Sequence, residues 1–400
     1  MRSRRALFAL ALLCPLLLVA GIYLGGHPQL LPGAARDTLV ADSDAQLYEE
    51  ALDLIAKDYY RPVDRRALVN RSLTSAVESL RDDFSNYFTP TDYTDFQQTT
   101  NGEFVGVGIS VEAADKLKRG LRVLKVYDGS PAKRAGLRSG DLVTKVDGRA
   151  TAGQSTDAVT TQIKGPVGTS VSLTFGSGER RLTEQVKRER VSLPIVQSRM
   201  ERKDGRKVGY VSLASFTSGA HGRVGAEVRK LVKQGAQGMV LDLRNNGGGL
   251  LDEAVLISSI FIGEGTIVST KGRSKPKRVY TATGGAIDSD VPVVVLVNGN
   301  SASASEIVTG ALQDRKRATV VGTKTFGKGV FQEVKQLSNG GALDITVGEY
   351  FLPGGRNLGG GGVRRGAGVK PDVAASDNPR TRRDEALDRA LDVVGSTAAT

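Results

Sequence analysis

Ser303 and Lys328 have the residue types and the surroundings that acyl-transfer chemistry requires. An apolar, β-branched run at residues 293–297 predicts a buried strand, and a helical pattern begins at Ser303 after a short polar turn. A serine at such a turn lies beside backbone N–H groups and the positive end of a helix dipole, where a nucleophile is useful. Lys328 lies between two glycines, and Gln332 follows four residues later. The pattern predicts a serine nucleophile with a lysine base.

The scarcity of histidine favours Lys328 over a histidine as the catalytic base. The chain has two histidines, and His27 lies beside the N-terminal apolar run, so a Ser-His-Asp triad would have to use His221. A serine–lysine pair is a recognised variant of the same logic. It requires a lysine pKa that falls from about 10.4 to about 7, which disfavours the charged form by about 4.6 kcal/mol. We expect Lys328 to be buried away from carboxylates, with the neutral amide of Gln332 as its partner.

Both residues also have interpretations without chemistry. Ser303 and Glu306 fit a capping box, in which the serine oxygen would serve only the backbone N–H groups of a helix. Lys328 would then be a solvated loop lysine. A second Ser-x-x-Lys pattern occurs at residues 274–277, within a run of five cations at residues 271–278, and we interpret it as a solvated loop.

The region around both residues resembles the carboxyl-terminal processing (tail-specific) serine peptidases. The family's serine and lysine are 25 residues apart (328 − 303), as they are here. The resemblance implies that Ser303 is the nucleophile, Lys328 the general base and Gln332 the residue that orients the lysine. It is carried by Ser301-Ala302-Ser303-Ala304-Ser305-Glu306-Ile307, Gln313-Asp314, Thr325-Phe326-Gly327-Lys328-Gly329 and Gln332.

The glycine-rich turn at residues 244–250 is expected to contribute to the oxyanion hole. Three successive glycines allow backbone N–H groups to point into a site. The turn matches the family's Leu-Arg-x-Asn-x-Gly-Gly motif, with Gly247 where proline is common. The resemblance implies that the N–H groups of Gly249 and Ala304 form the hole, with Gly248 as the alternative to Gly249. A flexible turn without chemistry is the other interpretation.

Upstream, the chain resembles a PDZ domain. Gly106-Val107-Gly108-Ile109 looks like the Gly-Φ-Gly-Φ loop that binds a terminal carboxylate. In that mode, an extended peptide adds to a sheet edge while the loop N–H groups hold its carboxylate. Because Val107 and Ile109 face alternate sides of the strand, we expect one of those faces to line a pocket for an apolar C-terminal residue. The resemblance continues through Gly129-Ser130-Pro131-Ala132, Ala135-Gly136-Leu137 and the segment from Gly140 to Gly148.

Several regions must position these sites. Apolar periodicity predicts helices at residues 41–95, and short strands with many glycines predict the PDZ domain at residues 96–186. Alternating strands and helices follow at residues 187–375, and a helix with a tail at residues 376–400 ends the chain. The family resemblance extends from about Gln46 to Val394. It implies a mixed α+β and α/β multidomain fold, with N-terminal helices, an inserted PDZ domain and a Clp-protease/crotonase-like α/β superhelical core.

The N-terminus predicts export. Arg2, Arg4 and Arg5 precede an uncharged apolar run at residues 6–26, and about 20 such residues cross a bilayer. No convincing small-x-small cleavage site follows, so we interpret residues 1–26 as a retained membrane anchor, with a cleaved signal peptide as the alternative. The arginines would stay in the cytoplasm, which places the catalytic part outside. Residues 27–40 form the expected linker.

Composition limits cofactors and partners. Cys14 is the single cysteine and lies in the apolar run, so no disulfide and no cysteine-based metal site is expected. The resemblance implies no metal, nucleotide or other cofactor. The net charge of +12 comes from scattered cations without aromatic interleaving, which argues against nucleic acid. The expected partners are the membrane and protein or peptide substrates with free C-termini; a homo-oligomer is left open. The alternative hypotheses for the function are an inactive PDZ scaffold at the membrane and a His-dependent PDZ protease.

Overall fold

The computed structural model describes residues 43–114, 120–192, 194–378 and 380–397. The chain divides into two compact units, residues 1–81 and residues 82–400, which are described separately. The predicted anchor and linker, residues 1–26 and 27–40, lie outside the described residues. Among the residues that are described, no helix is both long enough and apolar enough to cross a membrane.

The described part of the first unit contains the two helices that its apolar periodicity predicts. They are α3 (Ser43–Asp58) and α4 (Arg65–Glu78). Asp64 is the N-cap of α4, because its carboxylate accepts a hydrogen bond from the N–H of Arg66 at 2.8 Å. The two helices are joined by an ion pair between Arg65 and Asp53 at 2.9 Å.

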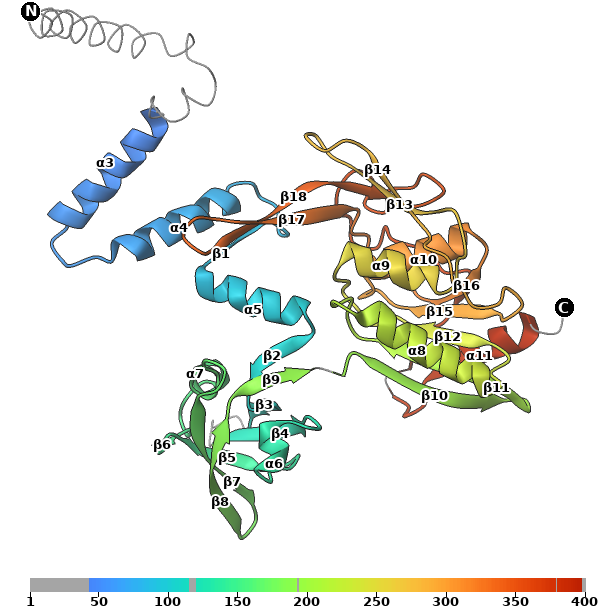
Figure 1. The fold of residues 1–400 in the computed structure, drawn as a ribbon, viewed down its shortest axis with the longest axis horizontal. Coiled ribbons are helices and arrows are strands. Elements are labelled where there is room, and N and C mark those ends of the chain that lie inside the picture. The colour runs from blue at the N-terminus through green and yellow to red at the C-terminus, as the bar shows by residue number, and fades with distance from the viewer. Residues whose placement is uncertain (1–42, 115–119, 193, 379, 398–400) are drawn as a thin grey trace, which may run out of the picture. The chain divides into compact units, whose positions relative to one another are not determined.

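A small β-domain forms the first part of the second unit (Figure 1). Its strands β3 (Ile109–Ala113), β4 (Leu121–Val126), β5 (Leu142–Val146), β7 (Ser170–Ser177) and β8 (Arg180–Lys187) lie in this order, and β6 (Arg149–Ala150) pairs with β5. Alternate residues of β7 are buried, as the two-residue period of a strand requires. Helices α6 (Pro131–Arg134) and α7 (Thr156–Ile163) complete this domain, in which β3 is an edge strand.

A two-stranded ribbon carries the chain into and out of this β-domain. Strand β2 (Glu103–Gly106) precedes the β-domain and pairs antiparallel with β9 (Glu189–Ser192), which follows it. Helix α5 (Pro90–Thr100) lies before the ribbon, and its N-cap is Thr89, whose hydroxyl accepts a hydrogen bond from the Asp92 N–H. Proline at the first position of α5 suits its fixed φ and its lack of an N–H.

The remainder of the second unit is built on a six-stranded sheet. Its order is β10 (Val196–Lys203), β11 (Arg206–Leu213), β12 (Met239–Asp242), β15 (Val293–Val297), β16 (Ala318–Gly322) and β19 (Val373–Ala374). Strands β10 and β11 are antiparallel, and the other pairs are parallel. Helices α8 (Ala220–Lys233), α9 (Leu251–Ser259) and α10 (Ala304–Asp314) pack on one face, and α11 (Glu385–Thr397) packs on the other (Figure 1).

Strand β15 shows why its sequence is uniformly apolar. Val293, Val295 and Val297 belong to the core beneath α8, α9 and α10. Val294 and Leu296 point to the opposite face, where α11 covers them. Both faces are therefore buried, and a parallel strand of this kind reads as a continuous hydrophobic run.

A second sheet lies beside α9 and α10. Its path is β1 (Asn86–Phe88), β18 (Ala342–Phe351), β13 (Thr266–Lys271) and β14 (Arg278–Thr281), and β17 (Val330–Gln336) also pairs with β18. Strand β1 is separated from β18 by more than 250 residues of sequence and brings the segment after Asp82 to this sheet. The α/β core, the PDZ-like domain and the N-terminal helices agree with the predicted fold class.

Candidate active site

Ser303 lies at the turn between β15 and α10, as its sequence context predicts. Its backbone has φ 55° and ψ −114°, a conformation that is costly for a residue with a Cβ. The turn places Ser303 on the wall of a cavity of about 760 Å³, together with Ala304 and Lys328. Strained turns of this kind persist where the surrounding structure holds them, and at Ser303 the holding group is Glu306.

One buried carboxylate joins the two halves of the site. Glu306 Oε2 accepts hydrogen bonds from the backbone N–H of Ser303 at 2.9 Å and of Lys328 at 3.0 Å. Its Oε1 accepts from Thr325 Oγ1 at 2.6 Å and from the N–H of Gly327 at 2.7 Å. Burial raises the pKa of Glu306, and these four donors act in the opposite direction. Glu306 is therefore a clamp between the turn at Ser303 and the segment of Lys328, to which it is bonded across a sequence separation of 22 residues.

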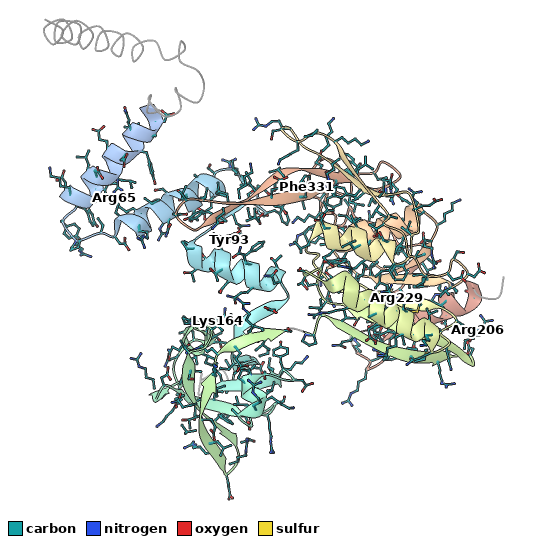
Figure 2. All side chains as sticks on the ribbon, in the orientation of Figure 1. Arg65, Tyr93, Lys164, Arg206, Arg229 and Phe331 are labelled. Carbon is teal, nitrogen blue, oxygen red and sulfur yellow. The ribbon has the colours of Figure 1, made fainter. Side chains whose placement is uncertain are left out.

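The Lys328 side chain is directed by Gln332. Lys328 Nζ donates to Gln332 Oε1 at 2.8 Å, and Gln332 Nε2 donates to Thr346 Oγ1 at 2.9 Å. Gln332 and Thr346 are cross-strand partners on β17 and β18, next to a register shift after Phe331. Thr346 thereby turns the amide oxygen toward the lysine. Phe331, labelled on β17 in Figure 2, also lines the cavity.

Burial lowers the pKa of Lys328, and nearby carboxylates oppose that effect. The expectation that carboxylates would be distant is wrong, because Asp344 and Asp82 both interact electrostatically with the ammonium group. The Phe84 ring lies under it, with Nζ 4.3 Å from the ring centroid. Desolvation is the largest of these effects, so the amine still loses its proton more readily than a free lysine.

The pKa values of the two carboxylates beside Lys328 are shifted in opposite directions. Burial raises the pKa of Asp344, and the charge of Lys328 offsets part of that increase. Burial also acts to raise the pKa of Asp82, but hydrogen bonds from Ser85, Thr346 and the Phe84 backbone bring it below its usual value. Ser85 Oγ donates to Asp82 at 2.6 Å and accepts from the Thr346 N–H at 3.0 Å.

These carboxylates were missed in the sequence because each comes from a distant element. Asp82 directly precedes Asp83-Phe84-Ser85-Asn86-Tyr87-Phe88, a segment that is similar to the family's Asp-Pro-x-Ser-x-Tyr pattern, with Phe84 in place of the usual proline. That similarity marks the segment as part of the family pattern, but it does not predict that Asp82 lies close to Lys328. Asp344 lies in β18 among alternating residues of an ordinary strand.

The glycine turn lies directly against the Ser303 turn. A Cβ on Gly248 would approach the Ala302 carbonyl to 2.8 Å and Ser303 Cβ to 2.9 Å, so only glycine fits there. Gly249 and Ala304 both line the cavity. The backbone of Gly249 has φ 142°, and a Cβ there would meet the Phe216 carbonyl at 2.4 Å. The glycines therefore permit two backbone segments to meet beside Ser303.

Asn246 holds these segments together from within the protein. Its Nδ2 donates to the Leu213 carbonyl at 2.8 Å, and its Oδ1 accepts from the N–H of Gly248 at 2.9 Å. Its backbone carbonyl accepts from Ser305 Oγ at 2.8 Å and from the Ala302 N–H at 3.0 Å. The Gly248 N–H already has a partner in Asn246, which favours Gly249 over Gly248 as a donor to a ligand.

His221 contacts Glu253 at the start of α8. It lies at the start of α8, where its Nδ1 is 2.9 Å from Glu253 Oε2. The same carboxylate accepts hydrogen bonds from the backbone N–H groups of His221 and Gly219, both at 2.8 Å. Glu253 reaches the cavity wall, but His221 is not among the described residues that line it. The geometry therefore gives no support to a triad with His221.

The predicted tail-binding loop joins β2 to β3. Gly108 has φ 86°, and a Cβ there would lie 2.2 Å from Ser130 Cβ. Val107 is only 1 % exposed, in the core of the β-domain, and its carbonyl accepts from the Ala132 N–H at 2.8 Å. Ile109, which begins the edge strand β3, is half-buried and is the residue of the pair that remains partly accessible.

A PDZ-like domain and an α/β core with a serine at a strand-to-helix turn define a class of PDZ-containing serine peptidases. Residues 207–375 match the model of peptidase family S41, and residues 122–175 match that of the PDZ domain. The carboxyl-terminal-processing protease of Synechocystis sp. is 36 % identical over 356 residues, which are 86 % of this chain and 83 % of that protein. The carboxy-terminal-processing protease of Bartonella bacilliformis is 33 % identical over 89 % of this chain and 81 % of that protein.

Comparison with a solved structure indicates the same family. A photosystem II D1 C-terminal processing protease is 30 % identical, with a TM-score of 0.50, and the match covers 90 % of this chain and 99 % of that one. The chain therefore belongs to peptidase family S41 and is a carboxyl-terminal processing serine protease with a PDZ domain. The resemblance stated from the sequence is confirmed, as are the fold class and the enzymatic nature of the protein.

Proposed function

We propose that the chain is a Ser-Lys endopeptidase in which Ser303 is the nucleophile and Lys328 the general base. The observation that supports this most directly is the shared cavity. Both residues line it, their backbones are clamped by one Glu306 carboxylate, and the Lys328 amine is partly buried with a lowered pKa. Gln332 orients the amine, as its 2.8 Å hydrogen bond to Nζ indicates.

In the proposed mechanism, neutral Lys328 accepts the proton of Ser303 Oγ as that oxygen attacks the peptide carbonyl carbon. The N–H groups of Gly249 and Ala304 donate to the oxyanion, and Lys328 returns the proton to the leaving amine. Water, deprotonated by the same lysine, then hydrolyses the acyl-enzyme. Among the described hydrogen bonds none joins Lys328 to Ser303, and we expect substrate binding to bring Nζ from Gln332 toward Oγ.

The PDZ domain would select substrates by their free C-terminal tails. The edge strand β3 is available for strand addition, and the loop Gly106-Val107-Gly108-Ile109 precedes it. Because Val107 is buried in the domain core, the pocket for the terminal side chain is proposed to lie beside Ile109. An apolar tail residue would gain burial energy there, whereas a charged one would be desolvated.

The N-terminal region is proposed to anchor the enzyme. The apolar run at residues 6–26 would cross the cell membrane, with the catalytic part outside the cytoplasm. A secreted form after signal cleavage is the alternative. The proposed division places the helical region at residues 41–95, the PDZ domain at 96–186, the protease core at 187–375 and the final helix and tail at 376–400.

Active-site labelling tests the proposal. A sulfonyl fluoride should modify the wild-type chain at Ser303 and leave Ser303→Ala unlabelled, since the reagent needs an activated serine hydroxyl. Mass spectrometry of the digested protein would locate the adduct. Equal labelling of both proteins, or none of the wild type, would favour the inactive PDZ scaffold over the enzyme.

A further inference from the structure

We propose that the hairpin formed by β13 and β14 is a docking surface for an acidic segment of the substrate, next to the scissile bond. The inference rests on the proposed peptidase function and names a chemical preference of its site. The sequence interpretation of residues 271–278 as a solvated loop describes the exposure of the cations but not their position.

The hairpin carries an uncompensated positive charge. Five cations fall within eight residues, and Lys275 alone has a carboxylate partner, Glu333, at 2.6 Å. The other four side chains are exposed, and within the described part of the chain none of them forms an ion pair. Four like charges held close together repel one another, and an anionic partner would relieve that repulsion. The four are Lys271, Arg273, Lys277 and Arg278.

The hairpin is fixed to the sheet that carries Gln332, the hydrogen-bond partner of Lys328. A Cβ on Gly272 would lie 2.0 Å from the Val347 carbonyl, at the register shift of β18. In the backbone register of β13 and β18, Lys271 lies opposite Glu349, and the Lys275 side chain binds Glu333 on β17, the strand of Gln332. The cations are thus presented by a braced ribbon, which costs a ligand less ordering entropy than a free loop would.

The same ribbon opens onto the catalytic cavity. Arg278 and Tyr280 on β14 line the cavity that contains Ser303. The Arg278 guanidinium lies over the Tyr280 ring, 4.6 Å from its centroid. Strand β14 ends the sheet, so within the described structure its outer edge is available to an extended peptide. A peptide that leaves the catalytic serine along this edge passes the cations.

Most carboxylates on the cavity wall are already engaged. Glu253 accepts from the N–H groups at the start of α8, and Glu333 pairs with Lys275. Asp344 lies beside Lys328. Asp252 is the remaining carboxylate among the lining residues. The described lining therefore holds more carboxylates than cations, and the positive charge that would favour Asp or Glu over Lys or Arg in the substrate comes from the hairpin, which reaches the cavity wall at Arg278.

An acidic peptide is favoured over an anionic lipid surface because one of the hairpin cations, Arg278, lines the cavity that holds the nucleophile. A charged rim of this kind raises association rates by about 10- to 1000-fold, and the effect falls with ionic strength. The Debye length of about 8 Å at 0.15 M salt limits the effect to residues close to the scissile bond. The preference should therefore be local and sensitive to salt.

The test uses peptides that share one cleavage sequence and one apolar C-terminus. Three neighbouring positions on one side of the scissile bond carry Asp, Asn or Lys, and a second set carries them on the other side. The full-length wild type should cleave the Asp peptide of one set about tenfold faster in kcat/KM than its Asn counterpart at low salt, and the ratio should approach one at 1 M salt. The Lys peptide should be the poorest.

Two variants locate the effect. One replaces the four unpaired hairpin cations by glutamine, and it should cleave the Asp and Asn peptides at equal rates. The matched control replaces four exposed cations that lie elsewhere on the protease core and its final helix, away from the cavity lining, and it should keep the tenfold preference. The control residues are Arg229 (labelled on α8 in Figure 2), Lys233, Lys370 and Arg389.

The outcomes separate this inference from the proposed function. Cleavage of all peptides at equal rates by the wild type would overturn the docking surface and leave the peptidase intact. An unchanged preference in the hairpin variant would also overturn it. If that variant instead loses binding to phosphatidylglycerol vesicles and keeps the preference, the surface serves a membrane. Absence of any cleavage by the wild type would overturn the peptidase proposal itself.

Discussion

Lys328 Nζ donates a 2.8 Å hydrogen bond to Gln332 Oε1, one residue from the point where the pairing of β17 and β18 shifts register. The shift makes Thr346 the cross-strand partner of Gln332, and Thr346 Oγ1 accepts a hydrogen bond from Gln332 Nε2. A neutral acceptor thus holds the amine without adding a negative charge to those of Asp82 and Asp344. This arrangement underlies the first two predictions.

Ser303→Ala and Lys328→Ala should each reduce peptide cleavage to background while the protein stays folded. A serine that served only as an N-cap would cost about 1 kcal/mol of stability on replacement and leave activity largely intact. Gln332→Ala should impair cleavage severely, and His221→Ala should change it little. Rates with a fluorogenic peptide, together with thermal unfolding of each variant, decide the matter. Substantial activity in either of the first two variants would exclude the dyad.

Cleavage should increase with pH through the lowered pKa of Lys328, because the neutral amine is the base. Protonation of this buried group opposes folding, so its contribution to stability also rises with pH, between the lowered folded pKa and the unfolded value of about 10.4. Asp344→Asn removes a charge that favours the ammonium form, and it should move the acidic limb of the profile to lower pH. A wild-type profile that still climbs near pH 10.4 would show that Lys328 is not desolvated.

Glu306→Gln should lower kcat by about 100-fold with a smaller effect on KM, since a displacement of about 1 Å in a catalytic group has that cost. One amide oxygen cannot accept from all four donors that the carboxylate now serves, so the turns bearing Ser303 and Lys328 would separate. Glu264→Gln, an exposed change, is the control. Wild-type kcat in Glu306→Gln would remove the clamp from the mechanism.

A substrate with a free apolar C-terminus should be cleaved faster than the same substrate amidated or ending in Asp. Amidation removes the carboxylate that the loop around Gly108 would bind, and a terminal Asp would be desolvated beside Ile109 at a cost of a few kcal/mol. The expected loss in kcat/KM is at least tenfold for both. Equal rates for the three substrates would mean that the PDZ groove does not select tails.

The protein should fractionate with membranes in the cells that express it, and its N-terminal sequence should begin near Met1. The reason is the apolar run at residues 6–26, which is long enough to span the bilayer. Immunoblots of membrane and soluble fractions, followed by N-terminal sequencing, provide the measurement. A soluble form that begins near Ala34 or Ala35 would identify a cleaved signal peptide instead.

The sequence by itself determined the elements and the family. The run at residues 293–297 is buried on both faces of a parallel sheet, and a strand in that position must be apolar throughout. The serine, the glycine turn and the Gly108 loop could be located because each depends on local backbone geometry, which short motifs encode. Their spacing was sufficient to indicate a carboxyl-terminal processing peptidase.

The tertiary structure decided what surrounds the lysine. Asp82 reaches Lys328 from the segment before β1, Asp344 from β18 and Glu306 from α10, through strand pairing and packing over long sequence separations. The pKa of the amine depends on the distances and burial of these groups, which no local pattern contains. The position of the cationic hairpin beside the cavity was decided in the same way. The pairing of β13 with β18 places Arg278 on the wall of the cavity that contains Ser303.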